Sequence, residues 1–517
     1  MPPKKQDDSK PTAKESLESV TNAASASSTT ASLGGRTPQP VEQQLWREDE
    51  GKSLKVQSFY APKSQANTRS DLTMAEVAKH DKRTDAWIVV DGHCYDVTAY
   101  VDVHPGGWLP IVNLAGKDVT DAFANYHPAR VYRMLLPQFY IGEVADYEVS
   151  DFVKEHRALR QQLLERNLFE TSPWYYYKLV VFLAFLFSAS MYITFALEQR
   201  VLGAVVLGLF WQQLAFVGHD VGHNALSHNR KADQFWGTLF GNFTGGISLA
   251  WWKRSHNVHH IVTNSVENDP DIQHVPFFAV TEKIFKPYWS TYHNKEFRMD
   301  NVFARFVIGH QHLLFYPVMA FARWNLYIQS WKLLLSSEPI QLRKLEILSL
   351  LGFAGWLSAL CLSFPTRWDS LVFLMVSHIV AGVLHVQITL SHFYMDTYHG
   401  RAYNDDSDEW FRMQLKTTMN VDCPEWMDWF HGGLQFQIEH HLWPRLPRHN
   451  LREARKLVKP FCEKHGVIYK EPGFVRGNIE MLASLRRVAA NCQNDETFNA
   501  ASHLWDTPIW NGLYARG

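Results

Sequence analysis

The stretch WWKRSHNVHH occupies residues 251–260 and places His256, His259 and His260 at positions i, i+3 and i+4. On a helix these positions share one face. A buried imidazole needs a hydrogen-bond partner or a metal ion, so three on one face are unusual in a protein core. A single cluster of this kind could be a group of surface histidines, but the chain repeats it. The stretch therefore predicts a helix that supplies ligands to a metal centre.

Similar helical spacings occur upstream and downstream. His219 and His223 form a pair at i and i+4, and Gln437, His440 and His441 form a triplet at i, i+3 and i+4. His392 lies at the end of an apolar run, from which it could reach the same place. Together these side chains are too many for one metal ion but suit two six-coordinate ions. Imidazole binds iron as well as zinc or copper. We expect one shared two-metal centre.

Composition limits the classes of protein that this chain can represent. The 517 residues suffice for several domains, and the formal net charge of −1 argues against nucleic-acid binding. The 19 Trp, 20 Tyr and 32 Phe suit a membrane protein with aromatic belts at its interfaces. The five cysteines form no CxxC pair, which favours a reducing cytosolic environment for the polar parts.

The chain divides into five predicted regions. Residues 1–70 are rich in Ser, Thr, Pro and Gln and contain no apolar signal-peptide core, which predicts a disordered cytosolic tail. Residues 71–147 predict a small α+β domain, and 148–173 predict a charged helical linker. Residues 174–470 predict an all-α membrane body, and 471–517 a C-terminal tail. The predicted fold class is thus a multidomain protein with one soluble and one membrane domain.

Within the small domain, two predicted strands at 87–90 and 93–97 flank an Asp91-Gly92 hairpin turn. The motifs YDVT at 95–98, HPGG at 104–107 and YH at 126–127 resemble those of a cytochrome b5 domain. The resemblance implies that His104 and His127 bind haem b. Two histidines on opposite walls of a cleft can supply both axial ligands of one iron. Because no open position remains on that iron, the haem would carry electrons rather than bind oxygen.

Four apolar runs are long enough to span a membrane, at residues 177–197, 201–217, 345–364 and 371–390. They pair into two helical hairpins, which places residues 1–173, 218–344 and 392–517 on one side. All histidine clusters and nearly all Lys and Arg residues share that side, so we expect it to be cytosolic. The runs at 235–252 and 303–324 are interrupted by glycines or polar residues and are doubtful spans.

The three clusters resemble the histidine boxes of the membrane fatty acid desaturases, as HDVGH at 219–223, HNVHH at 256–260 and QFQIEHHLWP at 435–444. A third box that begins with Gln, together with a fused cytochrome b5 domain, is similar to the front-end desaturases. The resemblance implies two irons, O2 as co-substrate, and electrons from NADH through a separate cytochrome b5 reductase. It also implies an endoplasmic reticulum membrane. Gln437 could ligate a metal directly or orient a bound water, and His392 carries over from a shorter match.

The expected enzyme is an oxidoreductase that acts on paired donors, reduces O2 to water and places a double bond in a lipid chain. Removing hydrogen from an unactivated methylene requires an oxidant that no side chain provides. Residues 245–253 and 268–274 are similar to both Δ6 acyl-lipid and Δ8 sphingolipid desaturases, and His274 after Gln273 favours the Δ8 type. The alternatives are a Δ6 or Δ5 acyl-lipid desaturase, a histidine-box lipid hydroxylase, and a haem electron carrier without catalysis.

Several polar residues near the boxes invite a supporting role. Asp220 and Glu439 are predicted to hold imidazole tautomers, although both could equally face solvent. Asn264 and the segment 269–271 could cap a helix or contact a lipid head group. The remaining histidines are expected to be packing or surface residues.

Overall fold

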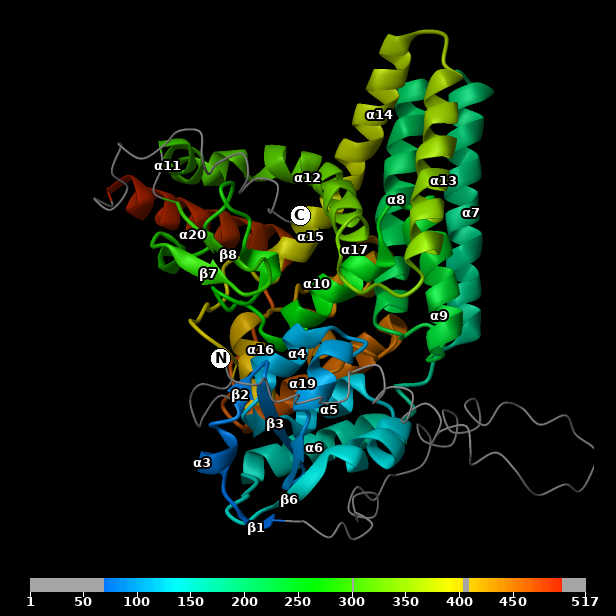
Figure 1. Ribbon diagram of the computed structural model, residues 1–517. Coiled ribbons are helices and arrows are strands. Elements are labelled where there is room, and N and C mark those ends of the chain that lie inside the picture. The colour runs from blue at the N-terminus through cyan, green and yellow to red at the C-terminus, as the bar shows by residue number, and fades with distance from the viewer. Residues whose placement is uncertain (1–68, 300–301, 403–408, 495–517) are drawn as a thin grey trace, which may run out of the picture.

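A computed structural model of the chain describes residues 69–299, 302–402 and 409–494 (Figure 1). The predicted tail at 1–70 therefore lies almost wholly outside the described residues. The described chain forms an N-terminal α+β domain beneath a helical body, with a group of upright helices rising from one side of the body.

The N-terminal domain is a twisted sheet with short helices, in agreement with the predicted α+β fold. Its strand order is β1-β6-β4-β3-β2, and β5 pairs with β3. The strands are β1 (Arg69–Leu72), β2 (Asp81–Lys82), β3 (Asp85–Val90), β4 (His93–Asp96), β5 (Lys117–Asp118) and β6 (Tyr140–Val144). The helical segments are α3 (Met74–Val77), η2 (Thr98–Val103), α4 (Trp108–Leu114), α5 (Thr120–Tyr126), η3 (Val131–Leu135) and η4 (Leu136–Phe139).

Local sequence signals explain the hairpin between β3 and β4. Asp91 and Gly92 both have positive φ, at 49° and 78°, which is the geometry of a type I′ turn. The turn sets the antiparallel register in which Val90 pairs with His93. Strand β4 leads from this hairpin into η2, which ends at the turn that carries His104.

Four helices are long and apolar enough to cross a membrane, as the sequence predicted. These candidate spans are α7 (Pro173–Phe195), α8 (Arg200–Gly222), α13 (Arg343–Leu362), and α14 (Arg367–Ala381) continued by α15 (Val383–Leu390). Figure 1 shows α7, α8, α13 and α14 standing side by side, with the two hairpin loops at the end far from the N-terminal domain. The opposite ends of the spans, next to which His219, His223 and His392 lie, are therefore on the side of that domain.

The rest of the body is built from elements between and after the spans. Before α13 these are α9 (Arg230–Gly237), η5 (Thr238–Thr244), α10 (Leu249–Ile261), η6 (Pro270–Ile272), η7 (Glu282–Ile284), β7 (Tyr288–Ser290), β8 (Lys295–Phe297), α11 (Val302–Gly309) and α12 (Gln311–Leu334). After α15 they are α16 (Trp410–Thr417), η8 (Glu425–Met427), α17 (Asp428–His431), η9 (Leu434–Phe436), α18 (Gln437–Leu442), η10 (Arg448–Asn450), α19 (Leu451–Lys464) and α20 (Phe474–Asn494).

The two doubtful runs do not span. Residues 235–252 divide among α9, the π-helical η5 and the start of α10, with Gly246 at a φ of 76°. Residues 303–324 divide between α11 and α12, which lie across the upright helices rather than along them (Figure 1). Glycine conformations and His310, where one helix ends and the next begins, interrupt both runs.

The region expected to be a C-terminal tail contains a packed helix. Helix α20 lies against α11 and α12 and buries Met481, Leu485, Val488 and Cys492 in the same apolar cluster as Phe315. These four residues follow the spacing of one helical face. Charged residues on the opposite face hid this pattern in the sequence.

The N-terminal domain and the body share one apolar core. A single cluster joins Leu114 and Ala122 of the first to Val258, Ile438 and Leu442 of the second. The linker helix α6 (Asp151–Glu165) lies between them and packs against α19. Because one cluster of buried apolar side chains crosses the boundary, the N-terminal domain is held against the helices that carry the histidines.

Candidate metal centre

The first box lies at the C-terminal end of α8, immediately where the span reaches the rest of the body. His219 and His223 are one turn apart on this helix, so their rings project to the same side, with centroids 4.8 Å apart. Gly222 lets α8 approach α10, because a Cβ there would lie 1.9 Å from Cζ3 of Trp252. This close approach brings the first box onto the second.

The second box lies on α10, whose start is capped from two directions. The Ser248 hydroxyl accepts from the backbone N–H of Trp251, and the buried Glu346 carboxylate of α13 accepts from the N–H of Ala250 at 3.0 Å. A carboxylate at a helix N-terminus is favoured by the helix dipole. The span α13 therefore orients the helix that carries His256, His259 and His260.

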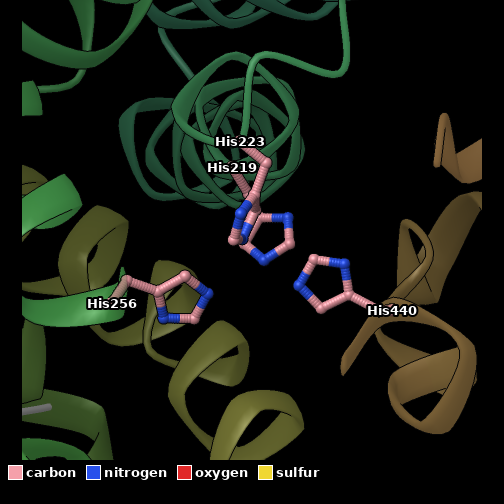
Figure 2. Close-up of side chains that lie close together, drawn as sticks. All are labelled: His219, His223, His256 and His440. Carbon is pink, nitrogen blue, oxygen red and sulfur yellow. The ribbon is translucent and has the colours of Figure 1, made fainter. Parts of the chain in front are cut away.

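Four histidines from three helices converge on one point. His219, His223, His256 and His440 each have a ring nitrogen within 4.8 Å of those of the others. Figure 2 shows their rings pointing toward a common space, with His219 and His223 from one helix and His256 and His440 on either side. This arrangement is the first histidine group.

Three more buried histidines form a second group. His259, His392 and His441 also have ring nitrogens within 4.8 Å of one another. His392 follows the end of α15, so the sequence-based expectation that this residue reaches the boxes agrees with its position. Its ring centroid lies 4.7 Å from that of His259 and 4.9 Å from that of His441.

Each ring of the second group has an acceptor at Nδ1, which leaves Nε2 to face the centre. His259 Nδ1 lies 3.0 Å from the Asp269 carboxylate, and His392 Nδ1 lies 3.3 Å from the carbonyl oxygen of Thr417. His441 Nδ1 lies 3.0 Å from Oε1 of Gln414, whose amide nitrogen donates to the carbonyl of His260. Hydrogen bonds of this kind orient an imidazole for metal binding.

His260 lies between the two groups. Its Nε2 is 3.1 Å from Nε2 of His256 and 3.1 Å from Nε2 of His440, while its ring stacks on His441 at a centroid distance of 4.1 Å. Nε2 of His260 has either one hydrogen or one lone pair, so it cannot make a full hydrogen bond to both nitrogens. Gln437 lines a small cavity together with His219 and His440, on the side of the first histidine group.

Sequence reasoning named the segment 269–271 as a possible helix cap or head-group contact, and Asp269 does cap η6, because its carboxylate accepts from the N–H of Asp271. It did not assign these acids to the histidines of the second box. Asp269 is fully buried and is oriented by the backbone N–H groups of Asn264 and Asp271, so that it accepts from His259. Asp271 lies 3.5 Å from Nδ1 of His256. The motif Asp269-Pro270-Asp271 after a histidine box was the available signal, because two carboxylates within a few residues of three imidazoles can neutralise and orient them.

The two acids that the sequence predicted to hold imidazoles, Asp220 and Glu439, have other partners in the structure. Asp220 accepts from the hydroxyl of Tyr176 and pairs with Arg448 at 2.9 Å. Glu439 accepts from Asn420 and from the hydroxyl of Tyr469, at 2.8 and 2.7 Å. Each therefore anchors the helix that carries a box to a neighbouring segment rather than holding an imidazole.

Burial sets the charge of the histidines. It lowers the pKa of His256, His260, His440 and His441, so these rings are neutral and can offer a lone pair. His259 differs: burial opposes its charge, but the Asp269 and Asp271 carboxylates outweigh burial and raise its pKa to about 9. A positive charge on this ring is what a cation in the centre would replace.

The donor set fits metal ions. Nε2 of His223, Nδ1 of His260 and Nε2 of His441 are buried without a hydrogen-bond partner. Leaving such groups unpaired is unfavourable, by about 1–3 kcal/mol each. Two groups of buried imidazoles, of which the second has its Nδ1 atoms already hydrogen-bonded, match the ligand preference of iron and other first-row metals.

His104 and His127 face one another in the N-terminal domain. Their ring centroids are 6.0 Å apart. Two metal–imidazole bonds of about 2.0 Å each, plus about 1.1 Å from each nitrogen to its centroid, require a separation of about 6 Å. His104 Nδ1 lies 2.8 Å from the carbonyl of Gly107, and His127 Nδ1 lies 3.1 Å from that of Phe123, so both can present Nε2 to a haem iron.

The HPGG turn needs both of its glycines, for different reasons. A Cβ at Gly106 would lie 2.8 Å from Cε1 of His104, so the first glycine makes room for the histidine ring itself. Gly107 has a φ of 84°, a conformation that L side chains rarely adopt. The turn therefore fixes the ligand ring as well as the backbone.

Comparisons with known proteins match two families along the chain. Residues 73–145 match the family described as Cytochrome b5-like Heme/Steroid binding domain, and residues 199–473 match the family described as Fatty acid desaturase. Among solved structures, the cytochrome b5 of Ostreococcus tauri virus 2 is 38% identical and covers 15% of this chain and 98% of that chain, with a TM-score of 0.14.

Three curated relatives cover most of the chain. A Delta(8)-fatty-acid desaturase of Helianthus annuus is 39% identical over 83% of this chain and 93% of the relative. An Acyl-lipid (9-3)-desaturase of Borago officinalis is 36% identical over 87% of this chain and 100% of the relative. A Delta 8-(E)-sphingolipid desaturase of Lachancea kluyveri is 42% identical over 77% of this chain and 71% of the relative.

Proposed function

The chain belongs to the fatty acid desaturase family, and from this premise we propose that it is a front-end Δ8 sphingolipid desaturase with two irons in its histidine centre. It is a membrane oxidoreductase with a fused cytochrome b5-like domain. The observation that carries the proposal is the convergence of His219, His223, His256 and His440 in one group beside His259, His392 and His441 in another. Two separate groups of buried imidazoles support two metal ions rather than one.

The protein would contribute ligands, orientation and the exclusion of water. Two bound irons would supply the redox chemistry and the reduction of O2 that no side chain provides. Asp269, Gln414 and the Thr417 carbonyl hold the imidazoles of the second group in place. His260 would complete the set between the groups, and Gln437 is suited to a direct or water-mediated role on the side of the first group.

The same proposal includes an electron supply and a location. NADH would reduce the haem through a separate cytochrome b5 reductase, with His104 and His127 as the haem ligands. The span ends that adjoin the histidine boxes lie on the side of the N-terminal domain (Figure 1). This arrangement supports a cytosolic location for both sites. Endoplasmic reticulum is the membrane in which such a reductase and lipid substrates would meet.

The choice of substrate rests on the relatives. The Delta 8-(E)-sphingolipid desaturases of two yeasts are 42% identical to this chain, whereas the acyl-lipid relative of Borago officinalis is 36% identical. We therefore place the new double bond in the long-chain base of a sphingolipid. The acyl-lipid relative is covered over its whole length, so a Δ6-type acyl-lipid activity is the second candidate.

Expression in a yeast strain without Δ8 sphingolipid desaturation tests the proposal. Long-chain bases and fatty acids would be profiled together, after feeding with C18 polyunsaturated acids. A new double bond in the long-chain base supports the proposal, and a new bond only on the carboxyl side of an existing one in fatty acids supports the acyl-lipid candidate. A hydroxylated product would contradict desaturation. His310→Ala is the matched control for ligand variants, because the His310 ring bonds only to its own helix at Phe306.

A further inference from the structure

Each haem-ligand segment of the N-terminal domain meets a histidine box of the body. Helix α4, which follows His104, packs against α10, which carries the second box. Helix α5, which precedes His127, reaches the end of α18, which carries the third box. The apolar side chains at both contacts belong to one buried cluster, so the two domains are in direct apolar contact.

A buried polar contact lies within this apolar interface. The side-chain amide of Asn125 donates to the carbonyl oxygen of Leu442 at 2.7 Å, and both groups are buried. Leu442 is the last residue of α18, where helix carbonyls lack partners within the helix. Asn125 supplies that partner from a position 317 residues away. An unpaired amide in this setting would be strongly unfavourable, so the bond selects one orientation of the domain.

The position of this bond in the sequence is informative. Asn125 lies two residues before His127, and Leu442 lies one residue after His441. A haem ligand and a ligand of the second histidine group are therefore joined through five residues of chain and a single hydrogen bond. Trp443, the next residue, is buried and stacks on His156 of the linker helix, which holds the same end of α18 from its other side.

We propose that Asn125 is a positioning residue that fixes the haem-ligand helix α5 to the third histidine box, and that the Asn125–Leu442 hydrogen bond is the link through which electrons pass between the two sites. This inference rests on the proposed function. In each transfer one electron leaves a ferrous haem, which becomes ferric, and reduces one ferric iron of the histidine centre to ferrous. No atom is transferred, and the reductase restores the ferrous haem.

Other contacts across the domain boundary provide a matched control. Arg401 donates to the backbone carbonyl of Asp81 at 2.6 Å, and Lys117 donates to the carbonyl of Ala402. These bonds also hold the N-terminal domain on the body, but neither involves a residue adjacent to a predicted ligand. If docking alone matters, Arg401→Ala should impair transfer as much as a change at Asn125.

The experiment uses the full-length holoenzyme in lipid nanodiscs. Asn125→Leu replaces the amide with an apolar group of similar size, and Asn125→Gln keeps a donor on a longer arm. Stopped-flow absorbance would follow reoxidation of pre-reduced haem by O2 in the presence of lipid substrate, with the chelator-treated enzyme as background. Hydrogen exchange of backbone amides in residues 440–446 and the haem midpoint potential provide readouts that do not depend on turnover.

We expect reoxidation to slow about tenfold in Asn125→Leu, with partial recovery in Asn125→Gln and little change in Arg401→Ala. Exchange in residues 440–446 should rise in Asn125→Leu, while the haem spectrum and potential stay unchanged. Wild-type rates in Asn125→Leu, or equal slowing in Arg401→Ala, would overturn the proposal. If the wild-type enzyme forms no desaturated lipid, the proposed function fails, and unchanged exchange in Asn125→Leu would separately refute the positioning role.

Discussion

The haem-type site and the histidine centre are built in opposite ways. His104 and His127 belong to one small domain, and each takes its Nδ1 hydrogen-bond partner from a backbone carbonyl three or four residues away. The histidine centre draws on residues from 219 to 441, and His259, His392 and His441 are oriented by groups 10 to 27 residues distant. A local site can form with its domain, whereas the distributed site requires the whole body to pack.

This contrast predicts that the two sites fail independently. Damage to a ligand of either site should leave the other loaded, while damage to helix packing should affect only the distributed one. The four predictions that follow test this separation, beginning with the largest expected effect.

The change His259→Ala should abolish lipid desaturation. It removes a ring of the second histidine group and leaves the Asp269 carboxylate buried without its partner, so the group loses both a ligand and its charge balance. The haem absorbance should be unchanged. Product analysis, iron content and the Soret band would be measured on one preparation, with His310→Ala retaining full activity. Loss of the Soret band would contradict independence of the sites.

The change His104→Ala should remove haem and stop turnover supported by NADH. The change removes one of the two imidazoles, His104 and His127, that would hold the haem iron. Iron in the histidine centre should remain, because its ligands lie in the other domain. The measurements are the Soret absorbance and iron content after haem removal. A matching fall in iron of the histidine centre would show that the two sites load together.

The change Asp269→Asn should weaken metal binding about 10- to 100-fold without removing a ligand. The amide keeps the size of the carboxylate but no longer provides the charge that holds His259. Iron retention during titration with a chelator would report the effect. Asp102→Asn, at an exposed pair with Arg83, is the control and should leave retention unchanged. Equal retention in both variants would mean that Asp269 does not support the centre.

The change Gly222→Ala should destabilise the body by about 1–3 kcal/mol through overpacking. The new Cβ would lie 1.9 Å from Trp252, whose ring contacts His219 and His256. Gly218→Ala is the matched control on the same helix, since its Cβ would meet nothing within 4 Å. Thermal unfolding of the purified protein would give the difference. The haem absorbance should not change below the unfolding temperature, and a similar loss in both variants would refute the clash.

Most of the histidines that the structure brings together at the two candidate sites carry short sequence signals. Histidines at i, i+3 and i+4 reveal a shared helical face, and HPGG reveals a turn, without knowledge of the rest of the chain. The four spans were also recognisable, because a continuous apolar run can be identified from composition alone. The hairpin at Asp91-Gly92 is a similar case, since two adjacent residues specify its turn.

Features that depend on distant partners were not predictable in this way. Gln414 lies 3.0 Å from Nδ1 of His441 and also donates to the carbonyl of His260, which is 154 residues away, so its role emerges only when these segments pack together. Asp269 is only 10 residues from His259, but its role depends on the folded turn in which the N–H groups of Asn264 and Asp271 orient its carboxylate. Asp220 and Glu439 looked equally suited to hold a ring, but the fold pairs them with Arg448 and with Asn420. Helix α20 similarly became recognisable as packed structure through its contacts with α11 and α12.

The sequence by itself determined which residue types and local spacings exist: three histidine boxes, the histidines at 104 and 127, and four apolar spans. Only the tertiary structure decided that the boxes divide into two groups, that His260 lies between them, and that Asn125 joins one site to the other. The physical reason is that periodicity specifies which face of a helix a side chain occupies. Which side chains share a buried space depends on how distant helices pack, and that packing is a property of the whole chain.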